Sequence, residues 1–192
     1  VFEQTIAASV SVAQAQNSVS DAQIEGWTYG ETAKTPSAAA AFGTAAFRYF
    51  EEDGTTAIDG VPENAGSYYV QAYVAADAAG NYTAAESELV PFAIAKAGNS
   101  ITLMTADGWT YDGTAHAAEA TAAYGTPVLT YYTETDEPLD GAPKNAGVYY
   151  AVATVAESEN YTGASKRVQF TVAQRELDFA DADWNALTFT YD

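Results

Sequence analysis

The stretch Gly66–Val74, GSYYVQAYV, recurs 81 residues later as Gly147–Val155, GVYYAVATV. In both copies one alternate set of positions, beginning at Tyr68 and at Tyr149, is aromatic or aliphatic throughout. The other set varies between polar and apolar residues. Successive side chains of a strand point to opposite faces. A period of two with one constant apolar face therefore predicts a strand that is half-buried on that face.

The surrounding sequence repeats with a similar spacing, 82 residues for the first pair below and 78 for the second. Trp27-Thr28-Tyr29 returns as Trp109-Thr110-Tyr111, and Phe92–Ala95 returns as Phe170–Ala173. A repeat of about 80 residues has the size of one small domain, so the chain is expected to be an array of modules.

The repeats divide the sequence into four parts. Module 1 is expected at residues 17–97 and module 2 at residues 98–175. Ser9–Ala15 matches Pro91–Ala97, so residues 1–16 are interpreted as the closing strand of a preceding repeat. Residues 176–192 are interpreted as the start of a third repeat. We expect the opening strand, Ile6–Ala13, either to pack along the first unit or to pair with residues 177–191 of another molecule, because unpaired strand edges invite pairing.

Each module is expected to be all-β, with about six strands and no capped helix. The Ala-rich stretches 37–46 and 114–124 are interpreted as strands, and a short helix is the alternative because alanine favours helices. Glu52-Asp53-Gly54 predicts a hairpin turn. The tyrosine after each Gly-x fits a hydroxyl that ties a corner at the start of a late sandwich strand.

These observations favour two tandem small β-sandwich (Ig-like) modules in an elongated array. β-grasp-like modules remain the alternative, because spacing does not give strand order. Phe92–Leu103 and Phe170–Phe179 join successive repeats without a run of Gly, Ser or Pro, so short and fairly stiff junctions are expected.

Composition restricts the partners. The net charge is −19, from 26 acidic and 7 basic residues, and the bases form no patch. Phosphate binding needs clustered cations, so nucleic acid is excluded as a partner, and an anionic membrane surface is disfavoured. The chain has no cysteine, which removes disulfides and thiolate metal sites. It has no apolar run long enough for a transmembrane helix, so no membrane insertion is expected within this sequence.

A group of motifs resembles a known family. WTYG at Trp27–Gly30 and WTYD at Trp109–Asp112, the Gly-x-Tyr-Tyr strands and the two Asn-Tyr-Thr triplets resemble the tandem MBG/YDG-type and bacterial Ig-like repeat modules of large bacterial surface proteins. The first copy departs from the YDG pattern, with Tyr29-Gly30-Glu31. The resemblance implies extracellular adhesins or stalks on the bacterial cell surface, and it implies no catalytic residues.

The residues show no motif for catalysis or for a cofactor. The single histidine, His116, stands where the first copy has Lys34, and a surface role is favoured over a catalytic one. Clustered acids at Glu51–Asp53, Asp136–Asp140 and Asp178–Asp183 could serve a glycosidase pair or a calcium ion. They lack the spacing of known sites and do not recur between copies. We therefore expect no enzyme and no cofactor, with Ca²⁺ as the alternative.

Four aromatic residues are the candidate binding residues. Trp27, Tyr29, Trp109 and Tyr111 could stack on the apolar faces of sugars, although core packing is the favoured interpretation. The chain is thus expected to act as a non-catalytic stalk or spacer of a surface adhesin. Its partners would be the neighbouring repeats of the same protein. The alternative is a module that binds a glycan or a host surface protein.

Overall fold

The computed structural model describes residues 9–176 of the chain, and it divides them into two compact units. The first comprises Val1–Ala97 with Ser158–Tyr161, and the second comprises Gly98–Glu157 with Thr162–Asp192, as far as each is described. The proposed start of a third repeat lies almost wholly outside the described residues. No helix, and so none able to cross a membrane, occurs between residues 9 and 176.

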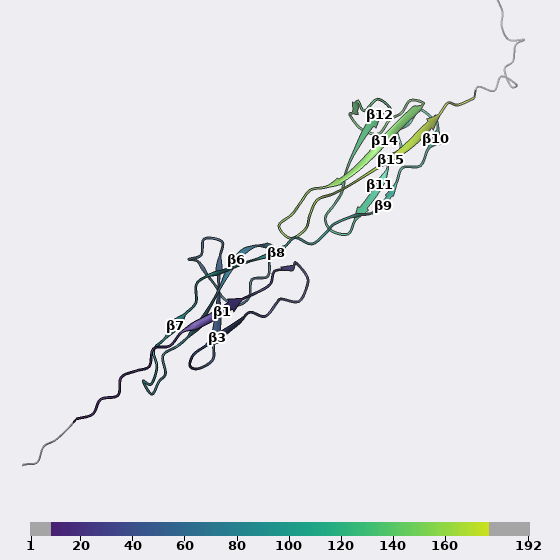
Figure 1. Cartoon of the computed structure of the whole chain (residues 1–192). Helices are drawn as coiled ribbons and strands as arrows, with labels where there is room; N and C mark the ends of the chain where they lie inside the picture. The colour runs from purple at the N-terminus through teal and green to yellow at the C-terminus, as the bar shows by residue number, and fades with distance from the viewer. Residues whose placement is uncertain (1–8, 177–192) are drawn as a thin grey trace, which may run out of the picture. The chain divides into compact units, whose positions relative to one another are not determined.

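Unit 1 contains a large sheet and a small sheet (Figure 1). The large sheet has the order β2–β8–β6–β4–β5, with β7 pairing to one end of β6, and the small sheet is formed by β1 and β3. β2 runs parallel to β8, and the other pairs are antiparallel. The strands are β1 (Val19–Gln23), β2 (Trp27–Thr28), β3 (Ser37–Ala40), β4 (Ala46–Glu51), β5 (Ala57–Ile58), β6 (Gly66–Val74), β7 (Ala85–Glu86) and β8 (Val90–Ala95).

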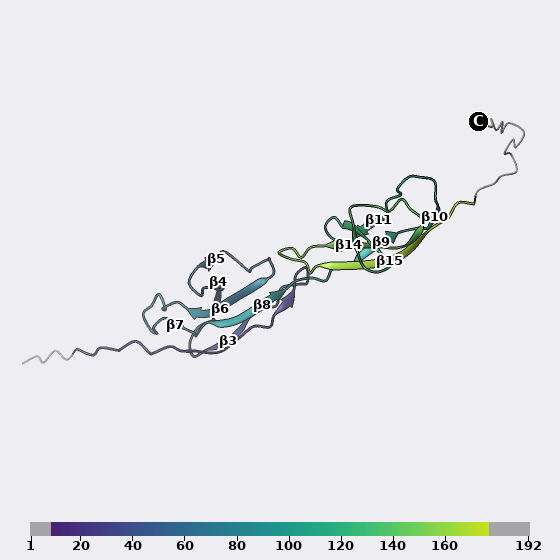
Figure 2. The same cartoon turned by 90° about the horizontal axis from the view of Figure 1, so that it is seen from above.

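Unit 2 repeats this topology, as Figure 2 lets the reader follow from a second direction. Its large sheet has the order β10–β15–β14–β12–β13, and β9 pairs with β11. A single long strand, β15, occupies the place of β7 and β8. The strands are β9 (Ile101–Thr105), β10 (Trp109–Thr110), β11 (Glu119–Ala122), β12 (Val128–Thr133), β13 (Pro138–Leu139), β14 (Gly147–Val155) and β15 (Ala164–Ala173).

Each unit is a small Ig-like sandwich. The central strands β4, β6 and β8 lie in the order of the C, F and G strands of an immunoglobulin sheet. The opposite sheet is reduced to two strands, where a constant-type domain has four. The β-grasp alternative is wrong, because that fold needs a helix over its sheet. The expected six strands become eight and seven because two-residue strands add to the sheet edges.

The expected constant face of the long strand is confirmed. In β6 the side chains of Tyr68, Val70, Ala72 and Val74 are all at most 8% exposed, and they alternate with partly exposed neighbours. In β14, Ala151, Ala153 and Val155 are buried in the same way. These strands therefore present one face to a core and the other to solvent.

The buried side chains form a separate cluster in each unit. In unit 1 the cluster contains Trp27, Tyr49, Tyr68, Val70, Phe92 and Ile94. In unit 2 it contains Ala118, Tyr131, Ala151, Phe170 and Val172. Every member of each cluster belongs to its own unit, so each repeat has its own hydrophobic core.

The Ala-rich stretches form strands rather than helices. Ser37–Ala40 and Glu119–Ala122 are β3 and β11. Each strand is followed by a bend at the equivalent glycine, Gly43 or Gly125, and both glycines have a φ of 78°. Pairing with β1 or β9 thus outweighs the helix propensity of alanine.

The described part of the opening segment does not pack along unit 1, so that expectation is wrong for residues 9–13. None of these residues belongs to a strand, and the side chains of Val10 and Val12 are 89% and 94% exposed. Backbone pairing with the rest of unit 1 begins at Ala15, which forms an isolated parallel bridge with Tyr82. Residues 6–8 and 177–192 lie outside the described part, so pairing between molecules stays a prediction.

Candidate functional site

The two Trp-Thr pairs form the short strands that lie parallel to the closing strands. Trp27 pairs with Ile94, and Trp109 pairs with Val172. The Trp27 ring is stacked on Phe92, with centroids 5.4 Å apart, and its side chain is only 7% exposed. Trp109 is stacked on Phe170 at 5.6 Å and is half-buried. Trp27 therefore belongs to the core of unit 1, and little of its surface is exposed to solvent.

A glycine before each tryptophan permits this close pairing. A Cβ atom at Gly26 would lie 2.5 Å from the carbonyl oxygen of Ala93, and one at Gly108 would lie 2.6 Å from that of Thr171. Both contacts are with backbone, which cannot turn away as a side chain could. Sequence reasoning missed this role, although the glycine stands at the same place in both copies.

The two tyrosines of the triplets differ in exposure. Tyr29 is half-buried against the unit 1 cluster, whereas the side chain of Tyr111 is 40% exposed. The backbone N–H of each tyrosine donates to a carbonyl oxygen at the end of the closing strand. The acceptor is Ala95 for Tyr29 and Ala173 for Tyr111, both at 2.8 Å. Of the four candidate aromatics, Tyr111 is thus the one that presents most of its surface to solvent.

His116 lies beside Trp109, and both residues line a cleft in unit 2. The two ring centroids are 4.8 Å apart. The cleft has a volume of about 340 Å³, and its lining includes Trp109, His116, Glu119 and Phe170. The Nε1 atom of Trp109 is buried and has no hydrogen-bond partner. A small ligand could enter this cleft, whose lining also includes the charged residues Asp107 and Glu119.

The polar group around His116 does not have the geometry of a catalytic triad. His116 Nε2 lies 2.8 Å from Asp112 Oδ2 and 3.1 Å from Thr114 Oγ1. A triad needs the hydroxyl on one ring nitrogen and the carboxylate on the other, whereas here one nitrogen serves both. The backbone N–H and the hydroxyl of Thr114, followed by His116, lower the pKa of Asp112 to about 2. These hydrogen bonds therefore close a local turn and favour the ionised form of Asp112.

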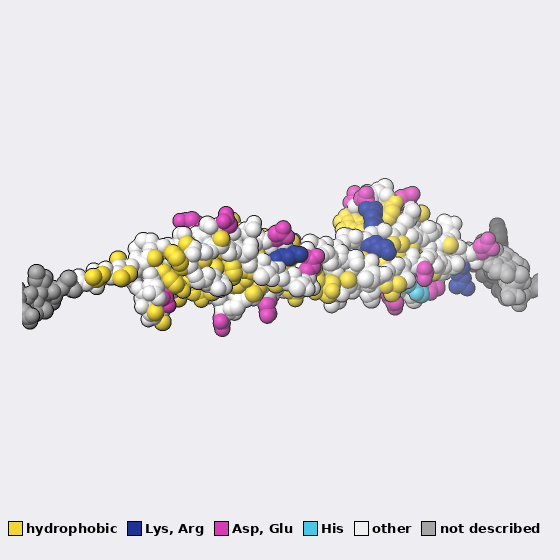
Figure 3. Space-filling model, turned by 60° about the horizontal axis from the view of Figure 1, so that its bottom comes forward, with side chains coloured by type: hydrophobic (Ala, Val, Ile, Leu, Met, Phe, Trp, Pro, Cys, Tyr) yellow, Lys and Arg dark blue, Asp and Glu magenta, His cyan; other side chains and the backbone are white. Residues whose placement is uncertain are grey.

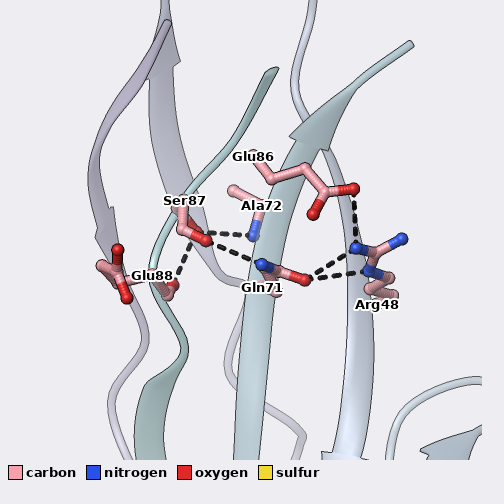
Figure 4. A network of polar contacts seen from close by, with 6 residues as sticks. All are labelled: Arg48, Gln71, Ala72, Glu86, Ser87 and Glu88. Carbon is pink, nitrogen blue, oxygen red and sulfur yellow. Dashed lines mark hydrogen bonds and ion pairs between the residues drawn. The ribbon is translucent and has the colours of Figure 1, made fainter. Parts of the chain in front are cut away.

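A polar network covers the outer face of the large sheet in unit 1 (Figure 4). Arg48 donates through Nε and Nη2 to Gln71 Oε1 at 3.0 and 2.8 Å, and it forms an ion pair with Glu86 at 2.8 Å. Gln71 Nε2 donates to the Ser87 carbonyl at 2.7 Å, and Ser87 Oγ accepts from Ala72 N–H at 3.0 Å. The network joins β4, β6 and β7. It also supplies hydrogen-bond partners to Ser87, which lies in the irregular chain between β7 and β8.

Unit 2 has an analogous arginine on a different strand. The guanidinium of Arg167, in β15, lies 3.8 Å from the ring centroid of Tyr150 and 6.0 Å from that of Tyr132. It also forms an ion pair with Asp136. Arg48 is likewise placed over Tyr73, at 5.3 Å. Because the two arginines are not equivalent in the repeat, comparing the copies could not reveal this shared feature.

In the described acidic clusters, Asp53 and Asp136 make contacts within their own units. Asp53 accepts hydrogen bonds from Thr55 N–H and from the N–H and hydroxyl of Thr56, at 2.6 to 2.7 Å. The Thr56 hydroxyl above all holds the pKa of Asp53 well below its usual range. In the equivalent turn, Asp136 has a positive φ of 64°, where Gly54 of unit 1 has 67°. Between residues 9 and 176 no three His, Cys, Asp or Glu side chains gather around a common metal position. The cluster Asp178, Asp181 and Asp183 lies outside that range.

The expected tyrosine corner is present in both units. Tyr68 donates its hydroxyl hydrogen to the Asn64 carbonyl at 3.0 Å, and Tyr149 donates to the Asn145 carbonyl at 3.1 Å. Each bond ties the start of the long strand to the Asn-Ala-Gly turn before it.

Comparison with known proteins identifies no family. No family model and no curated protein matches the chain. Among solved structures, it is similar to the N-terminal four Ig domains of Dscam1 isoform 7.44, with a TM-score of 0.31, 12% identity, and coverage of 87% of this chain and 45% of that one. Drosophila N-cadherin EC1-4 gives a TM-score of 0.28 and 12% identity, with coverage of 83% and 50%. The chain thus spans about half the length of these structures, and scores of this size identify neither a family nor an activity.

Proposed function

We propose that the chain consists of non-catalytic repeat modules of a bacterial cell-surface protein, which act as the stalk or spacer of an adhesin. The observation that carries the proposal is the separate core of each repeat. A spacer needs units that fold individually and can be added in series, because its length then grows with the number of repeats. The partners in this role are the neighbouring repeats, and the role needs no cofactor.

The surface chemistry supports the same proposal. Acidic side chains are scattered over the visible face of the molecule, and few basic ones lie among them (Figure 3). With a net charge of −19, like-charge repulsion opposes self-association. An extracellular spacer benefits from this property, since copies on one cell surface stand close together.

Small-angle scattering of the whole chain tests the spacer role. A compact globule of this length would have a radius of gyration of about 16 Å. Modules that act as a spacer predict a value well above this, with a pair-distance distribution that has a long tail. A value near 16 Å would contradict the proposal.

A second function, binding to a glycan or a host protein, is favoured by one observation only. Tyr111 is exposed at 40%, and Trp109, two residues before it, lines a cleft. Glycan-array binding that is lost in Tyr111→Ala and retained in Tyr29→Ala would support it. Trp27→Ala is unsuitable for this test because Trp27 lies in the core.

A further inference from the structure

Ser9–Ala13 is the most exposed apolar segment of the described chain. Val10 and Val12 are 89% and 94% exposed, and the residues between and beside them are serines and an alanine. Alternation of valine with serine is typical of a strand that buries one face. This segment has the pattern of such a strand, yet it has no sheet.

An asparagine that follows the segment shows how the segment aligns with the repeat. The side chain of Asn17 accepts from Phe42 N–H at 3.0 Å and donates to the Phe42 carbonyl at 3.0 Å. In unit 2, Asn99 makes the same two bonds with Tyr124, at 3.1 and 2.9 Å. Asn17 and Asn99 are therefore equivalent positions, each at the entry to its own unit.

Counting back from the two asparagines gives the equivalent of each valine. Five residues before Asn99 is Ile94, and five before Asn17 is Val12. Seven residues before them are Phe92 and Val10.

Phe92 and Ile94 are 8% and 2% exposed in the closing strand of unit 1. At the same places in the closing strand of unit 2, Phe170 and Val172 are 5% and 1% exposed. Ala93 and Thr171, between the members of each pair, are exposed, as Ser11 is. Val10 and Val12 thus occupy two positions that are buried in both complete repeats.

We propose that Ser9–Ala13 is a donated closing strand, which completes the large sheet of another repeat of this kind. The inference rests on the proposed array of repeats and specifies how the first unit joins its partner. Both complete units show the expected pairing: the closing strand lies between the long Gly-x-Tyr-Tyr strand, to which it is antiparallel, and the Trp-Thr strand, to which it is parallel. Val10 and Val12 enter the core of that partner, and Ser9 and Ser11 face solvent.

An extended chain tests the proposal directly. A copy of residues 17–90, which is unit 1 without most of its closing strand, replaces residues 1–8 and so stands immediately before Ser9. Hydrogen exchange is then measured by mass spectrometry in the extended chain and in the original one. We expect exchange at Val10 and Val12 to slow by about a hundredfold or more, because a paired strand of a folded unit exchanges only on opening.

Adjacent substitutions in the extended chain provide the matched control. Val12→Asp places a charge in the core of the added repeat and should abolish its protection, whereas Ser11→Asp places the same charge on the outer face and should retain it. Equal effects of the two variants would overturn the proposal. The proposal would also be overturned if the added repeat were unprotected in the extended chain. This holds even if the double substitution Val10→Phe with Val12→Ile restored its protection.

The result is separable from that of the spacer role. Protection of β6 and β14 in the two existing units reports whether the units themselves are folded, and scattering of the original chain reports their extension. Failure of the donated strand would leave both measurements unchanged.

Discussion

Truncation of one core residue should destabilise one unit and leave the other unchanged. Ile94 is 2% exposed and belongs to the unit 1 cluster. Replacement of a buried isoleucine by alanine costs about 2–5 kcal/mol. A repeat of about 80 residues has a stability of roughly 4–12 kcal/mol, so Ile94→Ala removes a large share of the stability of unit 1.

The assay is calorimetry combined with hydrogen exchange. A loss of 2 kcal/mol lowers the Tm of a domain of this size by about 8–16 °C. The protection of β6 should therefore fall in Ile94→Ala, while that of β14 stays as in the wild type. Val172→Ala, at the equivalent position in unit 2, should reverse the pattern. Thr171→Ala, on the exposed neighbour of Val172, is the surface control.

The reasoning would be refuted if Ile94→Ala lowered the protection of both units to the same extent. The two clusters would then behave as one cooperative core. An unchanged Tm of unit 1 would refute the assignment of Ile94 to its core.

Three further predictions follow from the local contacts. Tyr68→Phe should cost unit 1 about 1 kcal/mol in urea unfolding, because it removes the hydroxyl that ties the corner; an unchanged midpoint would show that the bond contributes nothing. Gly108→Ala should destabilise unit 2 by about 1–3 kcal/mol, because the added Cβ meets a backbone oxygen, whereas Gly98→Ala, with no atom within 4 Å, should be nearly neutral; equal Tm values would disprove the close approach. In a carboxyl NMR titration Asp112 should have its midpoint near pH 2, so its stabilising hydrogen bonds are complete above its ordinary pKa and are lost as the pH falls towards 2. Thr114→Ala should raise that midpoint, and an ordinary midpoint in the wild type would contradict the turn geometry.

The features that the sequence predicts well are the local ones. The buried face of β6 follows from the alternation that begins at Tyr68, because side-chain direction along a strand depends only on the strand itself. The tyrosine corner spans four residues and was visible in Gly-x-Tyr. Comparing the copies strengthened both predictions, since a position that stays apolar in two copies faces a core in both.

The features that the sequence did not reveal depend on the approach of distant strands. Gly26 is needed only because β2 lies against β8, and nothing near Gly26 shows which strand that is. The stacking of arginine on tyrosine was not predicted because Arg48 and Arg167 lie on different strands of the repeat. The low exposure of Trp27 also depends on its neighbours in space, which the sequence around Trp27 does not show.

The measurement that tests the central claim most directly is mechanical unfolding of the whole chain between handles at its two ends. Repeats with separate cores predict two release events, each adding roughly 250 Å of chain, because about 80 residues extend by about 3.6 Å each less their folded span. A single event that releases both repeats together would contradict the account.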